Sequence, residues 1–157
     1  MTGITLLLIA LVAAVVFGLV WQRRQGKVRT TGETTAVVTG ERRTLLEAAG
    51  VGPGSGHGRQ ATVLHFSAEW CGPCAAVRRV VGQVVADLAG EPEPPVEVEV
   101  DIDEYPALAK ELGVLSLPTT FILDADLQQR FRVSGVPSAA DLKAALGPLT
   151  RPPASKS

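Results

Sequence analysis

The two cysteines of this 157-residue chain lie three positions apart, in the segment Trp70-Cys71-Gly72-Pro73-Cys74. Two thiols at this spacing can exchange electrons with another disulfide, bind a metal ion, or form a structural cross-link. The function of the chain depends on which of these the pair does.

The metal-binding and structural alternatives have less support than redox exchange. A zinc site needs about four ligands, and the histidines available to join the cysteines are His57, in a glycine-rich loop, and His65, in a predicted strand. A structural disulfide across two intervening residues closes too small a loop to restrict the unfolded chain much. Redox exchange is therefore favoured, and no metal is expected.

The composition limits the class of protein. Fifteen Lys and Arg residues against 16 Asp and Glu residues give a formal charge of −1, without the basic excess that nucleic-acid-binding proteins show. No nucleic-acid partner is expected. The length suits one domain with a core of its own plus appendages, and two cysteines are too few for a disulfide-stapled scaffold.

An apolar segment from Ile4 to Trp21 runs for 18 residues without a charge. As a helix it would extend about 27 Å, close to the hydrocarbon thickness of a bilayer. A cleaved signal peptide fits less well, because no Lys or Arg precedes Ile4 and the segment lacks a small-residue cleavage pattern. The pattern predicts a transmembrane anchor over residues 1–22 that contacts the lipid bilayer from Ile4 to Trp21.

Basic residues directly after the apolar segment predict its orientation. Arg23, Arg24, Lys27 and Arg29 follow the segment, and positive charge stays on the cytoplasmic side of a membrane. We therefore expect a membrane protein whose basic spacer, residues 23–32, leads to a domain on the cytoplasmic face. The alternative is the opposite insertion, with an extracytoplasmic domain.

The cysteines lie where a predicted strand turns into a predicted helix. The apolar segment from Ala61 to Ser67 is typical of a strand buried on both faces. After Cys74, valines recur at helical spacing as far as Gly90. The pair is thus expected in a strand-to-helix turn.

The rest of the chain predicts a mixed α/β domain. From Val96 to Asp103, apolar residues alternate with acids, which indicates a strand with one polar face. Further predicted elements are a weak strand at 34–39, helices at 41–51, 105–112 and 138–146, and strands at 119–124 and 128–133. The pattern predicts a central sheet with flanking helices over residues 33–147 and a disordered tail over 148–157.

The cysteine segment, followed by Leu117-Pro118-Thr119, a hairpin and a helix, resembles the thioredoxin family. The resemblance covers roughly residues 60 to 147. It implies a thioredoxin-like fold and a protein disulfide reductase. It also implies a redox-active disulfide between Cys71 and Cys74 in place of a cofactor, a protein disulfide as substrate, and an upstream electron donor.

The chemistry of the pair follows from its place in the chain. Cys71 at the exposed start of a helix would have its thiolate stabilised by unpaired N–H groups and the helix dipole. This thiolate attacks a substrate disulfide, and Cys74, one turn later, attacks the mixed disulfide and releases the reduced substrate. In the family, a Gly-Pro insert like Gly72-Pro73 belongs to reducing members.

The resemblance also implies a substrate-binding surface. Pro118 matches the cis-proline that faces the cysteines in this family, and the backbone of the preceding residue, Leu117 here, pairs with an extended substrate. Gly135 matches a glycine that lets the substrate approach. Trp70 matches an aromatic residue at the rim of the site.

Two residues depart from the family pattern. The family usually has a buried aspartate six residues before the first cysteine, where this chain has His65, and a nearby lysine where this chain has Glu99. The hypothesis is that the imidazole of His65 accepts the proton of Cys74, helped by Glu99. A hydrogen-bonded core histidine and a solvated glutamate explain the same residues equally well.

Two other functions remain open. One is a membrane-tethered docking or redox-sensing module that does not turn over, and that holds a partner in the groove at Pro118. The other is an extracytoplasmic reductase, for example one serving cytochrome c maturation. The substrate, the electron donor and the reduction potential do not follow from the sequence.

Overall fold

The structure is a computed structural model that describes residues 2–24, 29–30, 38–53 and 60–151. Its helices are α1 (Thr2–Arg24), α2 (Gly40–Ala48), α3 (Cys74–Asp87), α4 (Pro106–Glu111), α5 (Ala139–Leu146) and the short 3-10 helix η2 (Gly147–Leu149). Its strands are β1 (Arg29–Thr30), β2 (Thr62–Ser67), β3 (Val96–Asp101), β4 (Thr119–Leu123) and β5 (Gln129–Ser134).

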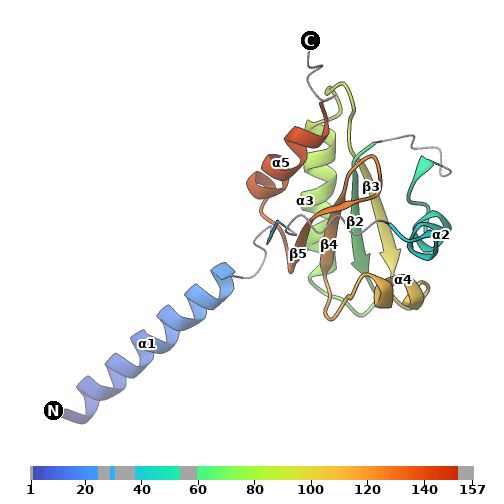
Figure 1. Cartoon of the computed structure of the whole chain (residues 1–157). Coiled ribbons are helices and arrows are strands. Elements are labelled where there is room, and N and C mark those ends of the chain that lie inside the picture. Colours follow the sequence, from blue (N-terminus) through green and yellow to red (C-terminus); the bar gives the residue numbers. More distant parts are fainter. Residues whose placement is uncertain (1, 25–28, 31–37, 54–59, 152–157) are drawn as a thin grey trace.

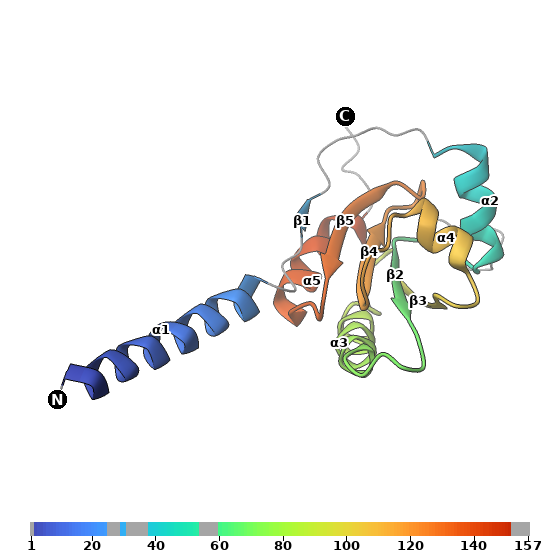
Figure 2. The same ribbon diagram turned by 90° about the horizontal axis from the view of Figure 1, so that it is seen from below.

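The strands form one mixed sheet in the order β1-β5-β4-β2-β3. Strands β2 and β3 are parallel, whereas β4 is antiparallel to both β2 and β5. Helices α2 and α4 lie on one face of the sheet, and α3 and α5 cover the other (Figures 1 and 2). The predicted central sheet with flanking helices is confirmed.

Strand β2 is buried along its whole length, as its apolar sequence predicts. Leu64 and Phe66 pack into the core on the α2 and α4 side, while Val63 packs against α3 and α5. Because β4 and β3 flank β2 on either side, its backbone hydrogen bonds are satisfied within the sheet. The segment that carries the cysteines therefore follows a strand that is buried along its whole length.

Strand β3 keeps the predicted alternation, and its acids face α3. Val98 and Val100 join the core on the α4 side. On the other face, the Glu97 carboxylate lies under Gly82 of α3, where an added Cβ would stand 3.7 Å from its Oε2 atom. The sheet face under α3 thus carries partly exposed carboxylates next to an apolar core.

Helix α1 extends away from the sheet (Figures 1 and 2). Within the described ranges, none of the helices combines the length and apolar character needed to cross a membrane. The transmembrane helix predicted over residues 1–22 is therefore not supported. The large apolar side chains of α1 between Leu6 and Phe17 are exposed, whereas the side chain of Trp21 lies outside what the structure describes.

Two segment boundaries differ from the prediction. Within the predicted spacer, β1 pairs with β5 through Arg29 and Thr30. At the other end, residues 148–151 are ordered: Thr150 is buried, and its carbonyl oxygen accepts a hydrogen bond from the backbone of Glu93. The predicted tail therefore begins no earlier than residue 152. Most of the strand predicted at 34–39 lies outside the described residues, as does His57.

Candidate functional site

The topology brings four distant segments to one edge of the sheet. Strands β2 and β3 are parallel and end at this edge, β4 begins there, and β5 ends there. Cys71 follows β2, Pro118 precedes β4, and Gly135 follows β5. Residues that the sequence separates by more than 40 positions therefore meet around the cysteine turn.

Cys71 and Cys74 form a disulfide whose Cα atoms are 5.5 Å apart. Helix α3 begins at Cys74, with Pro73 at its N-cap, a place where the missing proline N–H costs nothing. Cys74 is buried and Cys71 is partly exposed. This asymmetry leaves Cys71 as the sulfur that another disulfide can reach, as the sequence predicts.

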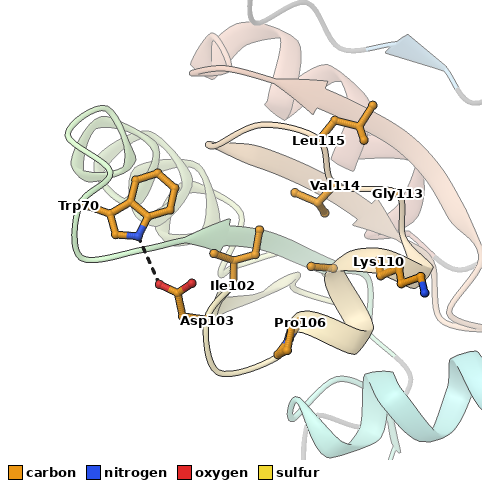
Figure 3. Close-up of a pocket in the computed structure, with 9 residues that line it drawn as sticks. Trp70, Ile102, Asp103, Pro106, Lys110, Gly113, Val114 and Leu115 are labelled. Atoms are coloured by element: carbon orange, nitrogen blue, oxygen red, sulfur yellow. Dashed lines mark hydrogen bonds between the residues drawn. The ribbon is translucent and has the colours of Figure 1, made fainter.

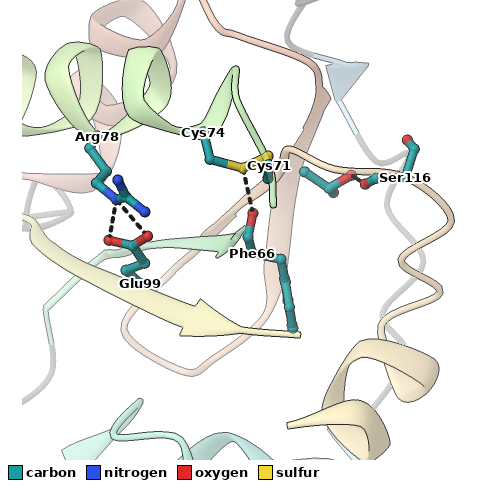
Figure 4. Close-up of a disulfide and its surroundings, with 7 residues drawn as sticks. Phe66, Cys71, Cys74, Arg78, Glu99 and Ser116 are labelled. Atoms are coloured by element: carbon teal, nitrogen blue, oxygen red, sulfur yellow. Dashed lines mark hydrogen bonds and ion pairs between the residues drawn. A yellow bond between two sulfur atoms is a disulfide. The ribbon is translucent and has the colours of Figure 1, made fainter. Parts of the chain in front are cut away.

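The sulfur of Cys74 faces the interior. Its Sγ atom lies 4.0 Å from the carbonyl oxygen of Phe66 in β2 (Figure 4). Further along the same helix face, Val77 and Val81 are fully buried. When the disulfide is reduced, the thiol of Cys74 is therefore created in a site closed to bulk water.

The proline loop opposite the cysteines has the predicted cis peptide bond, between Leu117 and Pro118. The backbone N–H of Gly135 donates to the carbonyl oxygen of Pro118 at 2.8 Å, and the hydroxyl of Thr119 donates to the carbonyl oxygen of Ser116 at 2.7 Å. Gly135 has a φ of 90°, in the left-handed region that favours glycine. Pro118 is buried, and Leu117 is partly exposed beside it.

A groove lies beside Trp70 that the sequence does not predict. The cavity has a volume of about 500 Å³, and its lining includes Trp70, Ile102, Asp103, Val114 and Leu115 (Figure 3). Trp70 is 70% exposed and Leu115 is 93% exposed. No periodic pattern marks Leu115, because it lies in a loop, and exposure of a loop residue is decided by the fold.

His65 is fully buried, and the carboxylate within hydrogen-bonding distance of its ring belongs to Glu97, not to the Glu99 of the hypothesis. The Nε2 atom of His65 lies 2.9 Å from Oε1 of Glu97. Glu99 is the neighbour of His65 in the β2–β3 register, but its carboxylate oxygens accept hydrogen bonds from Nε of Arg78 at 2.7 and 2.9 Å (Figure 4). Arg78 on α3 thus binds the carboxylate of Glu99, the residue that the sheet register pairs with His65.

The charge of Glu99 is favoured by its surroundings. Burial alone would raise the pKa of Glu99, but hydrogen bonds from Ser67 and Arg78, together with electrostatic attraction to His65 and Arg78, outweigh burial and lower its pKa below the ordinary value. Glu99 is therefore a carboxylate at neutral pH. Its partner Arg78 is half exposed.

The described residues contain no cluster of three or more His, Cys, Asp or Glu side chains arranged to hold a metal ion. Of the four ligands that the sequence offered for zinc, His57 lies outside the described ranges and His65 is engaged by Glu97. The redox group of the site is the cysteine pair itself.

The sequence of the chain is similar to that of known thioredoxins. It is 36% identical to a thioredoxin-like protein of Synechocystis over 80 residues, which are 51% of this chain and 72% of that protein. It is 33% identical to the chloroplastic M-type thioredoxin of Chlamydomonas reinhardtii over 49% of this chain, but spans about half (53%) of that relative.

Solved structures of thioredoxins resemble the fold. Chloroplastic thioredoxin z superimposes with a TM-score of 0.52 and 28% identity, covering 71% of this chain and 89% of that one. A thioredoxin mutant from Halobacterium salinarum gives a TM-score of 0.50 and 31% identity, over 60% and 78% of the two chains. The family model for thioredoxin matches residues 57–147, more than half of the chain. The chain therefore belongs to the thioredoxin family, and it is a disulfide oxidoreductase whose redox pair is Cys71 and Cys74.

Proposed function

We propose that the protein reduces disulfide bonds in other proteins, with Cys71 as the attacking thiolate and Cys74 as the resolving thiol. The observation that carries this proposal is the difference in burial between the two cysteines. A disulfide in another protein can approach Cys71, whereas Cys74 is reachable from within the same turn. The order of attack follows from that access.

The reaction conserves electrons in two exchange steps. The Cys71 thiolate attacks one sulfur of the substrate disulfide, forms a mixed disulfide, and releases the other substrate sulfur as a thiolate. Cys74, as a thiolate, then attacks Cys71; the intramolecular disulfide forms, and the second substrate thiolate leaves. An upstream dithiol donor must return two electrons to the pair before the next cycle.

The reducing direction is supported by the residues between the cysteines. Gly72 and Pro73 are both exposed and carry no charge or imidazole. The thiolate of Cys71 therefore gains stabilisation from the helix start and not from a neighbouring cation. A less stabilised thiolate favours the oxidised pair, which makes the reduced pair a better electron donor.

The surface around Cys71 supports a protein substrate. The partly exposed Leu117 next to Pro118, together with Gly135 and Trp70, surrounds the accessible cysteine. We propose that an extended segment of the substrate pairs with the backbone at Leu117 and crosses in front of Gly135. Gly72 and Pro73 complete the contact surface on the side of α3.

Turnover with insulin tests the proposal. With a dithiol reductant supplied, the parent protein should accelerate insulin reduction, and Cys71→Ser should abolish the acceleration. Cys74→Ser should keep the first step and accumulate mixed disulfides at Cys71. Binding of a partner without any turnover would instead support the docking or redox-sensing module.

We also propose that the N-terminal helix attaches the protein to a lipid surface, with the redox domain on the cytoplasmic side. The exposed apolar side chains between Leu6 and Phe17 support attachment, and the basic residues from Arg23 to Arg29 support this side. Cell fractionation tests attachment, since a protein that stays in the supernatant contradicts it. An impermeant thiol reagent that labels Cys71 in intact cells would place the domain outside the cytoplasm.

A further inference from the structure

A layer of polar side chains lies between helix α3 and strands β2 and β3. His65 of β2 is fully buried, and the Glu97 side chain of β3 is 28% exposed. The Glu97 carboxylate lies next to Gly82 of α3, where an added Cβ would be 3.7 Å from Oε2. One end of the His65–Glu97 contact is therefore closed to water, and the other end reaches the surface.

The contact with Glu97 determines which nitrogen of neutral His65 carries the proton. A carboxylate has no proton to donate, so at 2.9 Å the Nε2 atom must donate to Oε1 of Glu97. The Nδ1 atom of the same ring then carries a lone pair. This follows the rule that the hydrogen bond at one imidazole nitrogen selects the role of the other.

The lone pair of Nδ1 points into the interior and is not used there. Nδ1 of His65 and the hydroxyl oxygen of Thr120 are both buried, and neither has a hydrogen-bond partner among the described residues. His65 and Thr120 are direct neighbours across the β2–β4 pair. Buried polar atoms without partners are rare, so two of them on neighbouring strands mark a site for a further hydrogen-bond partner.

The thiol of Cys74 is such a partner, because it exists only after reduction. The Cys74 sulfur contacts the carbonyl oxygen of Phe66, the residue that directly follows His65. On β2, the side chains that face α3 alternate, so that His65 lies on the face covered by this helix. Reduction therefore creates the Cys74 thiol beside the β2 residue that follows His65, under the helix that covers the His65 side of the sheet.

We propose that Glu97 is the positioning residue of a proton relay from Cys74 through His65. The relay rests on the proposed reductase chemistry, in which Cys74 must become a thiolate. The thiol proton of Cys74 passes to Nδ1 of His65, directly or through a water held by Thr120, and the imidazolium is stabilised by the Glu97 carboxylate. The Cys74 thiolate attacks Cys71, the substrate thiolate leaves, and the imidazolium returns its proton to that thiolate or to water.

The other charged groups around His65 do not perform this role. Of the acids on β3, Glu97 contacts the ring and Glu99 interacts with it electrostatically. Arg78 of α3 and Ser67 of β2 are hydrogen-bonded to Glu99, and Thr120 of β4 is the register neighbour of His65. Glu99 is held by both of its oxygens to Arg78. The described carboxylate in contact with the imidazole is that of Glu97.

Glu97 and Glu99 provide a matched pair of variants. Glu97→Gln and Glu99→Gln remove the same charge from the same face of the same strand, two residues apart. Each reduced full-length variant is mixed with dithiobis(nitrobenzoate) in a stopped-flow instrument. The first coloured thiolate reports attack by Cys71, and the second reports resolution by Cys74.

We expect Glu97→Gln to slow the second phase at least about tenfold, by analogy with metal-bound histidines that lose an orienting carboxylate. The first phase should be unchanged. The pH profile of the second phase should move to higher pH, because the Cys74 thiolate then forms without a stabilised imidazolium. Glu99→Gln should leave both phases near the parent rates.

A second measurement separates the relay from a general effect of the substitution. In a His65→Asn background, Glu97→Gln should slow the second phase no further, because the residue acts through the imidazole. Equal slowing by Glu97→Gln and Glu99→Gln, or an unshifted pH profile in Glu97→Gln, would overturn the relay. Loss of the first phase in the parent protein would instead overturn the proposed reductase.

Discussion

The indole nitrogen of Trp70 donates a hydrogen bond to Oδ2 of Asp103 at 3.2 Å. This contact ties the residue directly before Cys71 to the segment that follows β3 (Figure 3). The indole is otherwise largely open to solvent. Its orientation beside the reactive sulfur is therefore decided by a carboxylate that is remote in the sequence.

Replacing Asp103 should impair protein substrates more than small ones. Asp103→Ala frees the indole, and the loss of one exposed hydrogen bond, about 1 kcal/mol, corresponds to a rise of about fivefold in KM for insulin. The rate with a small disulfide should not change. Steady-state kinetics with both substrates measures the difference. Asp103→Asn keeps an acceptor for the indole and serves as the control, so an equal loss in both variants would contradict this role.

The exposed side chain of Leu115 should contribute to substrate binding. A charge in the apolar groove opposes an apolar substrate segment, so Leu115→Glu should lower kcat/KM for insulin about tenfold, or about 1.4 kcal/mol, which exceeds the cost at most interface residues. The thermal midpoint should stay the same, because the side chain is 93% exposed. Leu115→Met preserves the apolar contact and should behave like the parent. Unchanged kinetics in Leu115→Glu would remove the groove from the binding surface.

The lowered pKa of Glu99 predicts an acid-dependent contribution to stability. Because the carboxylate form is favoured in the folded state, the contribution is fully present above the ordinary value of 4.5 and is lost as the pH falls through the lower folded value. The free energy of unfolding, measured in urea, should therefore decrease less between pH 7 and pH 3 for Glu99→Gln than for the parent protein. Parallel curves for the two proteins would show that Glu99 is not linked to folding.

Gly135 should tolerate a side chain poorly for two reasons. Its φ of 90° lies where an added Cβ costs about 1–2 kcal/mol, and its backbone N–H holds the carbonyl oxygen of Pro118. Gly135→Ala should lower both stability in urea and insulin reduction. Gly147→Ala is the matched control, because Gly147 has helical angles and an added Cβ meets nothing within 4 Å. Equal stability of the two variants would contradict the backbone argument.

Much of the fold follows from local patterns. The alternation in β3 places its valines in the core, and Ser138 caps α5 by accepting the N–H of Asp141 at 3.1 Å. These features depend on residues a few positions apart, where chain geometry links pattern to structure directly. The cysteine pair and its place between a strand and a helix also follow from local sequence patterns.

Other features depend on which segments the fold brings together. The hydropathy of the N-terminal segment predicts a membrane span. However, no described helix is long and apolar enough to cross a membrane. The helix-stopping Gly147-Pro148 marks the end of α5, but Thr150 is buried beyond it because the loop at Glu93 packs there. A local stop signal contains no information about a distant partner.

The sequence by itself determined the chemistry, because two thiols three residues apart at the start of a helix favour exchange with a disulfide wherever the helix lies. The tertiary structure decided which carboxylate serves His65. Glu97 and Glu99 look alike in an alternating strand, and Glu99 is the neighbour in register. The packing of α3 separates their roles, because Arg78 binds the carboxylate of Glu99 while that of Glu97 contacts His65.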